Sequence, residues 1–430
     1  MTRTVYDTFG EELVTWIRGE SKKKDRFNGS KKMCKKGVLV VYKEDYPWDV
    51  RVEKIVLALS SFGKNVVVLS NNIGNRETRS NGEGCKIFRI PAMAWMPGRV
   101  SSFFKLPIWF NPIWVFTLWN VLKKEQIQTV IVRDLPLLRT ILLFKKRYNL
   151  TVIYDMAEVY PEMYKSMQLY SKPTIFNRFL KNPTVARTYE KSVLKKIDFT
   201  FTMIDESRDR LLRMGISPEK VGIVSNTASV TKLADEVIHT GRELRIVYVG
   251  NLTKLRGLDL LLEAISRYLA AEAPKKEIRV DIIGTGSQKE KLIDLCNKLK
   301  LNEVVTIHGW LSQEEVDRKL AEANLGVVTY RVCGHWNHTI PNKIFDYMVS
   351  GLPVLSTPVV PIKRIITETE CGLVTDDESP ESICQALIKL ADASLRQELS
   401  NNGRLAISEK YNWEHDKSVM LSSLSKLGVM

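Results

Sequence analysis

The sequence predicts an α/β protein made of two parallel-sheet domains, and three observations support this. First, 430 residues exceed one ordinary core and fit two domains of roughly 150 to 200 residues each. Second, short β-branched runs alternate with longer amphipathic stretches from Gly37 onward, as in βαβ units. Third, an apolar fraction of 44% with dispersed Gly and Pro is typical of a globular chain. We therefore expect two doubly wound, Rossmann-like domains that face each other across a cleft.

Each half of the chain has its own series of predicted strands, bounded by polar or Gly-containing turns. In the first half they are Val38–Tyr42, Val66–Ser70, Ile87–Ile90, Thr129–Arg133, Val152–Asp155, Phe199–Ile204 and Gly222–Val224. In the second half they are Arg245–Val249, Val280–Ile283, Val304–His308, Leu325–Thr329, Pro353–Ser356 and Gly372–Val374. The expected divisions are a basic arm (1–36), a first domain (37–230), a second domain (243–410) and a terminal helix that crosses back to the first domain (411–430).

The composition narrows the class of protein. A net charge of +15 raises the local concentration of phosphates, whether on nucleic acid, lipid headgroups or a sugar nucleotide. No RRM, KH or helix-turn-helix motif occurs, which disfavours a nucleic-acid-binding protein. The 6 cysteines lack CxxC pairs and histidine partners at ligand spacing, which argues against a disulfide framework and a zinc site. Because residues 1–34 contain no signal-peptide pattern, we expect a cytoplasmic protein.

For three segments the sequence leaves open whether they contact a membrane. The basic run from Lys22 to Lys36 is either a solvated arm or a contact with an anionic membrane surface. Residues 94–109 combine bulky aromatics with two cationic residues, which suits a bilayer interface, although a loop packed on its own domain would share this composition. Leu106–Leu122 is free of charge but contains two prolines, so we expect a core helix and not a membrane span.

Two glycine turns follow strands of the second half. The first, Gly250-Asn251-Leu-Thr-Lys254-Leu-Arg256-Gly257, leads from a strand through a basic loop into a helix. Free backbone N–H groups, a helix N-terminus and two cationic side chains there suit a diphosphate, although a plain βα turn with incidental Lys254 and Arg256 has the same pattern. The second turn, Gly284-Thr-Gly286, opens a helix in the same way and strengthens the prediction.

The segment after Thr339 completes the predicted donor site. A helix that begins after Pro341 places Asn342 and Lys343 in its first turn, where they face an anion. Asp346 lies about one turn further along the same face. A carboxylate at this point can accept two hydrogen bonds from a ribose diol.

Several motifs together carry a resemblance to a known family. In the second half they are Gly250-Asn-Leu…Arg256-Gly257-Leu-Asp-Leu-Leu-Leu-Glu-Ala264, Gly284-Thr-Gly286, His308-Gly309-Trp310 and Pro341-Asn-Lys-Ile-Phe-Asp346-Tyr-Met…Gly351-Leu-Pro353-Val. In the first half they are Tyr46-Pro-Trp-Asp49-Val-Arg51-Val, Arg133-Asp134 and Tyr154-Asp155-Met-Ala-Glu158. With these motifs the sequence resembles family 4 of the retaining GT-B glycosyltransferases. The resemblance implies an acceptor-side first domain and a second domain that binds a nucleotide-sugar, with UDP- and GDP-sugars as the expected donors.

The resemblance also implies roles on the donor side. Arg256 contacts the diphosphate and stabilises the leaving group, with Lys254 and Lys343 as the other available cations. Asp346 holds the ribose at the second acid of the family's Glu-x7-Glu pattern. His338 replaces the first acid, which usually touches the transferred sugar, and is expected either to bind a sugar hydroxyl or phosphate or to be a surface histidine. Further donor contacts are expected from Gly250, Asn251, Gly284, Gly286, Gly309 and Asn342.

On the acceptor side, Glu158 and Asp155 follow a strand and are expected to orient the acceptor hydroxyl. Between them, Ala157 lacks the side chain that some relatives offer as His. Asp49 and Arg51 either face the cleft or form an internal ion pair that opens a helix.

Arg133 is the last acceptor-side candidate. The expected mechanism is front-face attack with retention, in which the departing phosphate takes the acceptor's proton. No DxD motif occurs, so we expect neither a metal nor a cofactor beyond the donor itself.

The expected function is sugar transfer to a saccharide or lipid-linked saccharide in surface polysaccharide or glycoconjugate biosynthesis. This would take place in the cytoplasm, with or without contact to the inner face of the membrane. The alternatives are a nucleotide-sugar epimerase of the same architecture and, less favoured, a basic nucleic-acid-binding protein.

Overall fold

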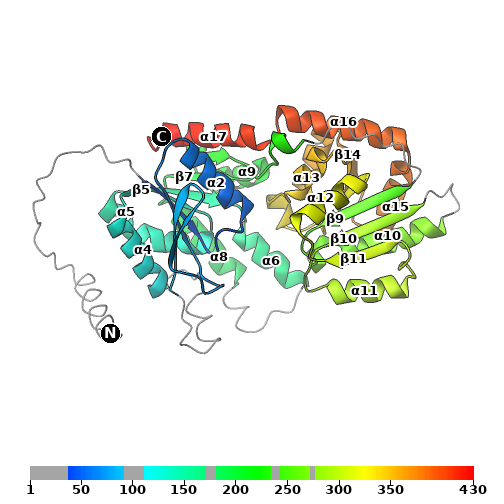
Figure 1. Cartoon of the computed structure of the whole chain (residues 1–430), viewed down its shortest axis with the longest axis horizontal. Helices are drawn as coiled ribbons and strands as arrows, with labels where there is room; N and C mark the ends of the chain where they lie inside the picture. The colour runs from blue at the N-terminus through cyan, green and yellow to red at the C-terminus, as the bar shows by residue number, and fades with distance from the viewer. Residues whose placement is uncertain (1–36, 92–110, 171–180, 234–242, 272–276) are drawn as a thin grey trace, which may run out of the picture. The chain divides into compact units, whose positions relative to one another are not determined.

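The computed structural model describes residues 37–91, 111–170, 181–233, 243–271 and 277–430. The basic arm 1–36, most of the connection between the two halves and residues 94–109 lie outside the described residues. Residues from 37 onward form two β-sheets with flanking helices, one from each half of the chain (Figure 1).

The first sheet has the strand order β3-β4-β2-β1-β5-β6-β7-β8. Its strands are β1 (Gly37–Tyr42), β2 (Val66–Ser70), β3 (Arg79–Gly82), β4 (Cys85–Arg89), β5 (Ile127–Val132), β6 (Thr151–Met156), β7 (Phe199–Thr202) and β8 (Val221–Ile223). All neighbours are parallel except β3 and β4, which pair antiparallel at one edge. Because each central strand is buried on both faces, its sequence is a continuous β-branched run such as Val-Val-Val-Leu in β2.

Helices cover both faces of this sheet. They are α2 (Val50–Ser61), α4 (Pro112–Lys124), α5 (Leu138–Tyr148), α6 (Tyr160–Tyr170), α8 (Pro183–Leu194) and α9 (Asp205–Arg213), with short 3₁₀ turns η1 (Leu135–Leu137), η2 (Pro218–Lys220) and η3 (Val230–Lys232). Val38 and Val40 of β1 share one core with Val52 and Ile55 of α2. Since successive strand residues point to opposite faces, the intervening Leu39 faces the other side.

The second sheet has the order β11-β10-β9-β12-β13-β14, and all its strands are parallel. They are β9 (Leu244–Val249), β10 (Ile278–Ile283), β11 (Val305–Gly309), β12 (Leu325–Val328), β13 (Val354–Ser356) and β14 (Gly372–Val374). The helices are α10 (Leu258–Ala270), α11 (Lys289–Lys298), α12 (Gln313–Glu322), α13 (Lys343–Val349), α14 (Val360–Thr369), α15 (Pro380–Leu390) and α16 (Ala393–Glu409), with η4 (Lys254–Arg256) and η5 (Trp336–His338). One large apolar core runs through this half.

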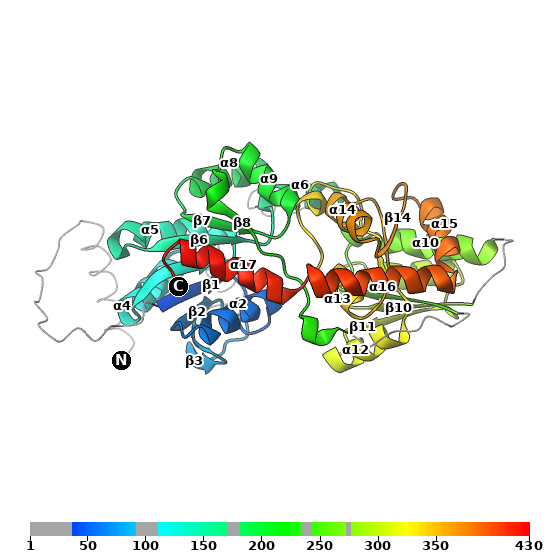
Figure 2. The same ribbon diagram turned by 90° about the horizontal axis from the view of Figure 1, so that it is seen from above.

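The last helix, α17 (Trp413–Lys426), belongs to the core of the first sheet although it follows the second sheet in sequence (Figure 2). Trp413, Met420 and Leu424 pack with α2, β1 and β7. Asp416 fastens the helix by accepting hydrogen bonds from the Ser225 N–H at 3.1 Å and the Thr227 hydroxyl at 2.5 Å.

The predicted α/β class with two doubly wound sheets is confirmed, and each predicted strand coincides closely with an observed one. One strand, β3, was not predicted, because Arg-Ser-Asn-Gly has no β-branched residue and forms only an exposed edge. The expected core helix within Leu106–Leu122 is α4, whose described part buries Trp114 and Leu118. Among the described residues, no helix combines the length and hydrophobicity needed to cross a membrane.

Candidate active site

The candidate site lies at the carboxyl ends of β9 and β12. In the second sheet these neighbours mark the point at which the strand order reverses. Loops that leave neighbouring strands at such a point separate from each other, so ligands of open parallel sheets bind there. The loop after β9 contains Gly250 to Gly257, and the loop between β12 and α13 spans residues 329–342 and is called the β12–α13 loop below.

Three glycines bring backbone segments together at this edge. The N–H of Gly284 donates to the carbonyl of Gly309 at 2.6 Å, and a Cβ on Gly284 would lie 1.9 Å from the carbonyl oxygen of Gly250. Gly250 and Gly284 have φ values of 144° and 137°, which side chains rarely tolerate. A Cβ on Gly250 would also lie 2.6 Å from the ammonium nitrogen of Lys343. Because Gly250 has no side chain, its backbone can lie directly beside the ammonium group of Lys343.

Two cationic side chains converge on one tyrosine. Arg256 Nη1 and Lys343 Nζ both donate to the hydroxyl of Tyr330, the latter at 2.8 Å. The guanidinium of Arg256 also lies 4.5 Å from the ring centroid of Tyr330 and 4.3 Å from that of Trp336. The ammonium of Lys343 lies 4.3 Å from the ring centroid of Tyr248. Aromatic faces attract cations but leave their charge in place.

Neither cation pairs with a carboxylate of the described residues. Lys343 is 8% exposed, and loss of water lowers its pKa well below the usual value, an effect that Arg256 increases and Asp346 opposes. The Nε of Arg256 is buried and has no hydrogen-bond partner in the described part of the chain. Since a buried cation without a counter-charge is costly, this arrangement suits a site that receives an anion.

Asp346 lies one turn beyond Lys343 on α13, which begins after Pro341 as predicted. Its side chain is exposed, yet protein surrounds it on most sides. Loss of water therefore raises the pKa of Asp346, and the ammonium groups of Lys54 and Lys232 oppose this rise. Asn342 is also exposed. Asn342, Lys343 and Asp346 thus lie together at the start of α13.

Lys254 has a different partner. Its ammonium lies 2.5 Å from Asp259 Oδ2, which also pairs with Arg331 at 2.6 Å. No described side-chain contact joins Lys254 to Arg256 or Lys343, so the structure does not place these three predicted cations in one cluster.

The remaining donor-side candidates are backbone positions and exposed groups at the same edge. A Cβ on Gly286 would lie 2.3 Å from the carbonyl oxygen of Leu252 and 2.7 Å from Asn251 Oδ1, so this turn is also tightly packed. Asn251 is exposed. Trp310, directly after Gly309, is 77% exposed and presents a large aromatic surface beside the glycines.

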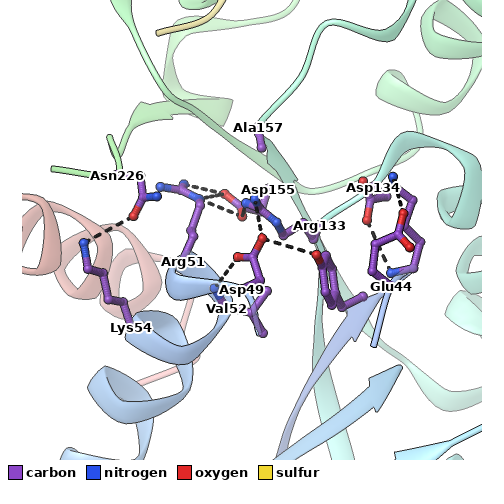
Figure 3. A network of polar contacts seen from close by, with 12 residues as sticks. Glu44, Asp49, Arg51, Val52, Lys54, Arg133, Asp134, Asp155, Ala157 and Asn226 are labelled. Carbon is purple, nitrogen blue, oxygen red and sulfur yellow. Dashed lines mark hydrogen bonds and ion pairs between the residues drawn. The ribbon is translucent and has the colours of Figure 1, made fainter. Parts of the chain in front are cut away.

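Predicted acceptor-side residues form one polar network in the first sheet (Figure 3). Arg51 donates from Nη2 to Asp155 Oδ1 at 2.5 Å and from Nε to Oδ2 at 2.9 Å. Arg133 donates to Asp155 at 3.4 Å and to Asp49 at 3.0 Å. Asp49 also caps α2 by accepting from the Val52 N–H at 2.9 Å. The network favours the internal ion pair over the cleft-facing interpretation of Asp49 and Arg51.

The structure places Asp155 in the interior of the first half and not at the predicted contact with the acceptor. Its side chain and that of Arg51 are each 1% exposed, and both oxygens of Asp155 are bonded to guanidinium groups. The residue still belongs to β6, so its side chain points into the domain and not beyond the strand end. Burial alone would raise the pKa of Asp155, but Arg51 and Arg133 outweigh it and hold the pKa below the usual value.

Glu158, beyond the end of β6, faces a residue that the sequence analysis missed. Its Oε2 is buried, although the side chain as a whole is 41% exposed. Oε2 lies 3.6 Å from Nδ1 of His335, and neither atom has a hydrogen-bond partner among the described residues. Loss of water raises the pKa of Glu158 to about 7, against the charges of Arg133 and Arg256. Burial, with Arg256 and His338, lowers the pKa of His335 to about 3. The two groups are therefore not an ion pair at neutral pH, because the imidazole is uncharged.

The predicted His338 lies in the same β12–α13 loop, where its imidazole contacts the loop backbone and its own carbonyl contacts α9. Its Nδ1 lies 2.9 Å from the carbonyl oxygen of Gly334, and its own carbonyl accepts from the Ser207 hydroxyl at 2.5 Å. His335, Tyr330 and Trp336 were missed, although aromatic and imidazole groups directly after a strand of such a sheet were a usable signal. Among the described residues, no group of His, Cys, Asp or Glu side chains is arranged to hold a metal ion.

Both halves of the chain match models of glycosyltransferase domains. The family model described as "Glycosyl transferase 4-like domain" matches residues 49–227, and that described as "Glycosyl transferases group 1" matches residues 243–393. A chitobiosyldiphosphodolichol beta-mannosyltransferase of Candida albicans is 26% identical over 221 residues, which cover 51% of this chain and 46% of that protein. The chain spans about half the length of the curated relatives it matches.

Solved structures show the same fold at low sequence identity. Sucrose-phosphate synthase of Thermosynechococcus elongatus has a TM-score of 0.75 at 16% identity, covering 91% of this chain and 99% of that one. Anabaena HepE in complex with UDP has a TM-score of 0.65 at 10% identity, covering 91% and 100%. The chain is therefore a GT-B-fold protein whose two halves are glycosyltransferase-type domains.

Proposed function

We propose that the protein is a retaining glycosyltransferase that moves a sugar from a UDP- or GDP-linked donor to a saccharide or lipid-linked saccharide. One observation carries the proposal: Arg256 and Lys343 meet on the Tyr330 hydroxyl, and the described residues offer neither of them a carboxylate. A diphosphate supplies the missing negative charge. The glycosyltransferase-type matches of both halves and the UDP bound by HepE support this class of ligand.

Each part of the donor has a chemical counterpart at the site. The diphosphate lies against Arg256 and Lys343 beside the bare glycine edge at Gly250. The ribose diol donates two hydrogen bonds to Asp346, as expected of a carboxylate one helical turn from Lys343. The base stacks on the exposed indole of Trp310, because a flat aromatic face accepts any nucleobase.

The cations also serve the chemistry. When the bond from the anomeric carbon to the diphosphate oxygen breaks, negative charge grows on that oxygen, and the fixed guanidinium of Arg256 stabilises it. The acceptor hydroxyl attacks from the same face, and its proton passes to the departing diphosphate, so the anomeric configuration is retained. With Arg256 and Lys343 in place, the proposed reaction uses no metal ion.

The cellular setting is part of the same proposal. The Candida relative is named for a dolichol-linked acceptor, which supports a lipid-linked saccharide here. We place the reaction in the cytoplasm, at the inner face of the membrane, in surface polysaccharide or glycoconjugate biosynthesis. The basic arm 1–36 and residues 94–109 are the segments proposed to contact the bilayer.

Two substitutions test the proposal. Arg256→Ala should lower the release of nucleoside diphosphate from the donor by roughly 10²- to 10³-fold, as loss of a preorganised charge-stabilising group does. Asp346→Ala should mainly weaken donor binding. Arg267→Ala, an exposed arginine paired with Glu381, is the matched control and should change neither quantity. Unchanged kinetics in both site variants would refute the assignment.

A further inference from the structure

Three buried polar atoms without partners lie where the two halves of the chain meet. They are Glu158 Oε2 from the first half, and His335 Nδ1 and Arg256 Nε from the second, each with no hydrogen-bond partner among the described residues. Buried polar atoms in folded proteins are nearly always paired, so unpaired ones in a cluster point to a missing polar ligand. The Glu158 and His335 atoms face each other at 3.6 Å.

The imidazole of His335 is held firmly in this position. Its backbone N–H donates to the Ser166 hydroxyl at 3.0 Å, and its ring lies 4.2 Å from that of Trp336, centroid to centroid. Next in the same loop, the Thr339 hydroxyl donates to the Ala157 carbonyl at 3.2 Å. The β12–α13 loop is thus bonded to the first half at His335 itself and again at Thr339, which fixes Nδ1 opposite Glu158.

The chemistry of the pair selects the ligand group. A neutral imidazole offers one N–H donor and one acceptor nitrogen, and a carboxyl group accepts or donates according to its protonation. A hydroxyl group, which both donates and accepts, satisfies such a pair.

The position of the pair indicates which hydroxyl it receives. Glu158 follows β6 in the first half, the acceptor side of the proposed enzyme, while Arg256 interacts with Glu158 from the proposed diphosphate site. A hydroxyl bound by the pair therefore lies between the acceptor side of the site and the proposed position of the diphosphate leaving group. We propose that Glu158 and His335 bind the attacking hydroxyl of the acceptor and hold it for reaction with the donor sugar.

This inference rests on the proposed function and adds residues to it. In the reaction, the bond from the anomeric carbon to the diphosphate oxygen breaks and the bond to the acceptor oxygen forms. The acceptor's proton moves to the departing diphosphate oxygen. Glu158 and His335 gain and lose no proton in this scheme: they hold the acceptor oxygen in place through hydrogen bonds.

The test uses His335→Phe and Glu158→Gln, which keep side-chain shape. The first removes the imidazole nitrogens, and the second replaces one carboxyl oxygen by an amide nitrogen. The probes are UDP and GDP, and UDP-glucose and GDP-mannose as donors with water as the acceptor hydroxyl. Dissociation constants come from calorimetry, and turnover is measured as release of nucleoside diphosphate at saturating donor. His415→Phe, an exposed histidine of α17, and Glu162→Gln, one turn from Glu158, are the matched controls.

We expect both site variants to bind nucleotide and donor within about twofold of wild type and to turn over roughly 10²-fold more slowly, as misplacement of a reacting group does. Without ligand, the melting temperature of His335→Phe should equal or exceed the wild-type value, since this variant loses an unpaired buried nitrogen. Glu158→Gln keeps a polar atom at each oxygen position and should unfold at the wild-type temperature or above it. A lower melting temperature would overturn the proposal in favour of a structural pair. The melting temperatures test the proposal even where the wild-type protein does not hydrolyse the donor with water.

Two other outcomes also overturn it. If His335→Phe weakens donor binding tenfold but leaves nucleotide binding and turnover at saturation unchanged, the pair holds the transferred sugar and not the acceptor. If turnover and binding are unchanged in both variants, the pair has no part in the reaction. Failure of the proposed function itself is distinct, because wild type would then bind none of the four probes.

Discussion

Replacement of Arg51 by Met provides a direct test of the network in the first sheet. The guanidinium of Arg51 binds both oxygens of Asp155 and donates to the Ser225 carbonyl at 2.8 Å. Met fills a similar volume but carries no charge, so Arg51→Met leaves the Asp155 carboxylate buried with Arg133 at 3.4 Å as its nearest cation.

The size of the effect follows from this burial. Removing one partner of a buried ion pair typically costs about 3–5 kcal/mol, because the other charge stays buried without compensation. Since Arg133 remains, we expect the lower end, about 3 kcal/mol. In a domain of this size the melting temperature should fall on the order of 10 °C.

The assay is thermal unfolding followed by circular dichroism, with two comparisons. Arg187→Met removes an arginine that is 59% exposed and paired with Glu162, so it should cost under about 1 kcal/mol. The double variant Arg51→Met, Asp155→Leu removes both charges and should recover most of the loss, because no buried charge is left.

The pH dependence gives an independent check. Because Arg51 and Arg133 hold the pKa of Asp155 below its usual value, the stability from this pair is present above about pH 4 and is lost as pH falls through the lower folded pKa. The difference between wild type and Arg51→Met should therefore shrink in acid. A single variant within about 1 kcal/mol of wild type, or a double variant no more stable than the single one, would refute the reasoning.

Three further predictions concern the second sheet and its junction with the first. Lys343→Met should raise the melting temperature of the ligand-free protein and weaken UDP or GDP binding at least tenfold by calorimetry, because the ammonium is buried without a counter-charge; equal stability and affinity would contradict this. Gly284→Ala should abolish nucleotide binding and destabilise the fold, since its Cβ would lie 1.9 Å from the Gly250 carbonyl oxygen; a variant that binds normally in the same assay would show that this edge is not tight. Glu158 has a folded pKa of about 7 against 4.5 when unperturbed, so the folded state binds the extra proton and stability should fall as pH rises between these values; Glu158→Gln should remove that slope from a pH series of melting temperatures, and an unchanged slope would contradict the shift.

The sheets could be predicted from sequence because their signal is local. Runs such as Val-Val-Val-Leu in β2 and Ile-Val-Tyr-Val in β9 identify themselves as buried strands, and the turns between them carry Gly or polar residues. The helix that begins at Lys343 could be predicted for the same reason, because Pro341 directly precedes its first turn. Where the local signal is weak, as in the polar edge strand β3, the prediction failed.

The site was only partly predictable because its contacts join distant segments. Arg51 and Asp155 are 104 residues apart, and nothing local distinguishes a carboxylate that faces a ligand from one that faces a buried arginine. His335 was missed for a related reason: its importance comes from Glu158, which belongs to the other half of the chain. Arg256, Lys343 and Asp346 could be proposed from sequence because each lies beside a helix start that follows a strand.

The central claim is that the half-buried Arg256 and the buried Lys343 bind the diphosphate of a nucleotide-sugar. The most direct measurement is thermal unfolding of the wild-type protein and Asp346→Ala with UDP, GDP, ADP and CMP. A ligand at 100 times its dissociation constant adds about 2.7 kcal/mol to the stability of the native state. We predict that UDP or GDP raises the wild-type melting temperature by several degrees and that Asp346→Ala loses most of this rise. No rise with any of the four nucleotides would contradict the claim.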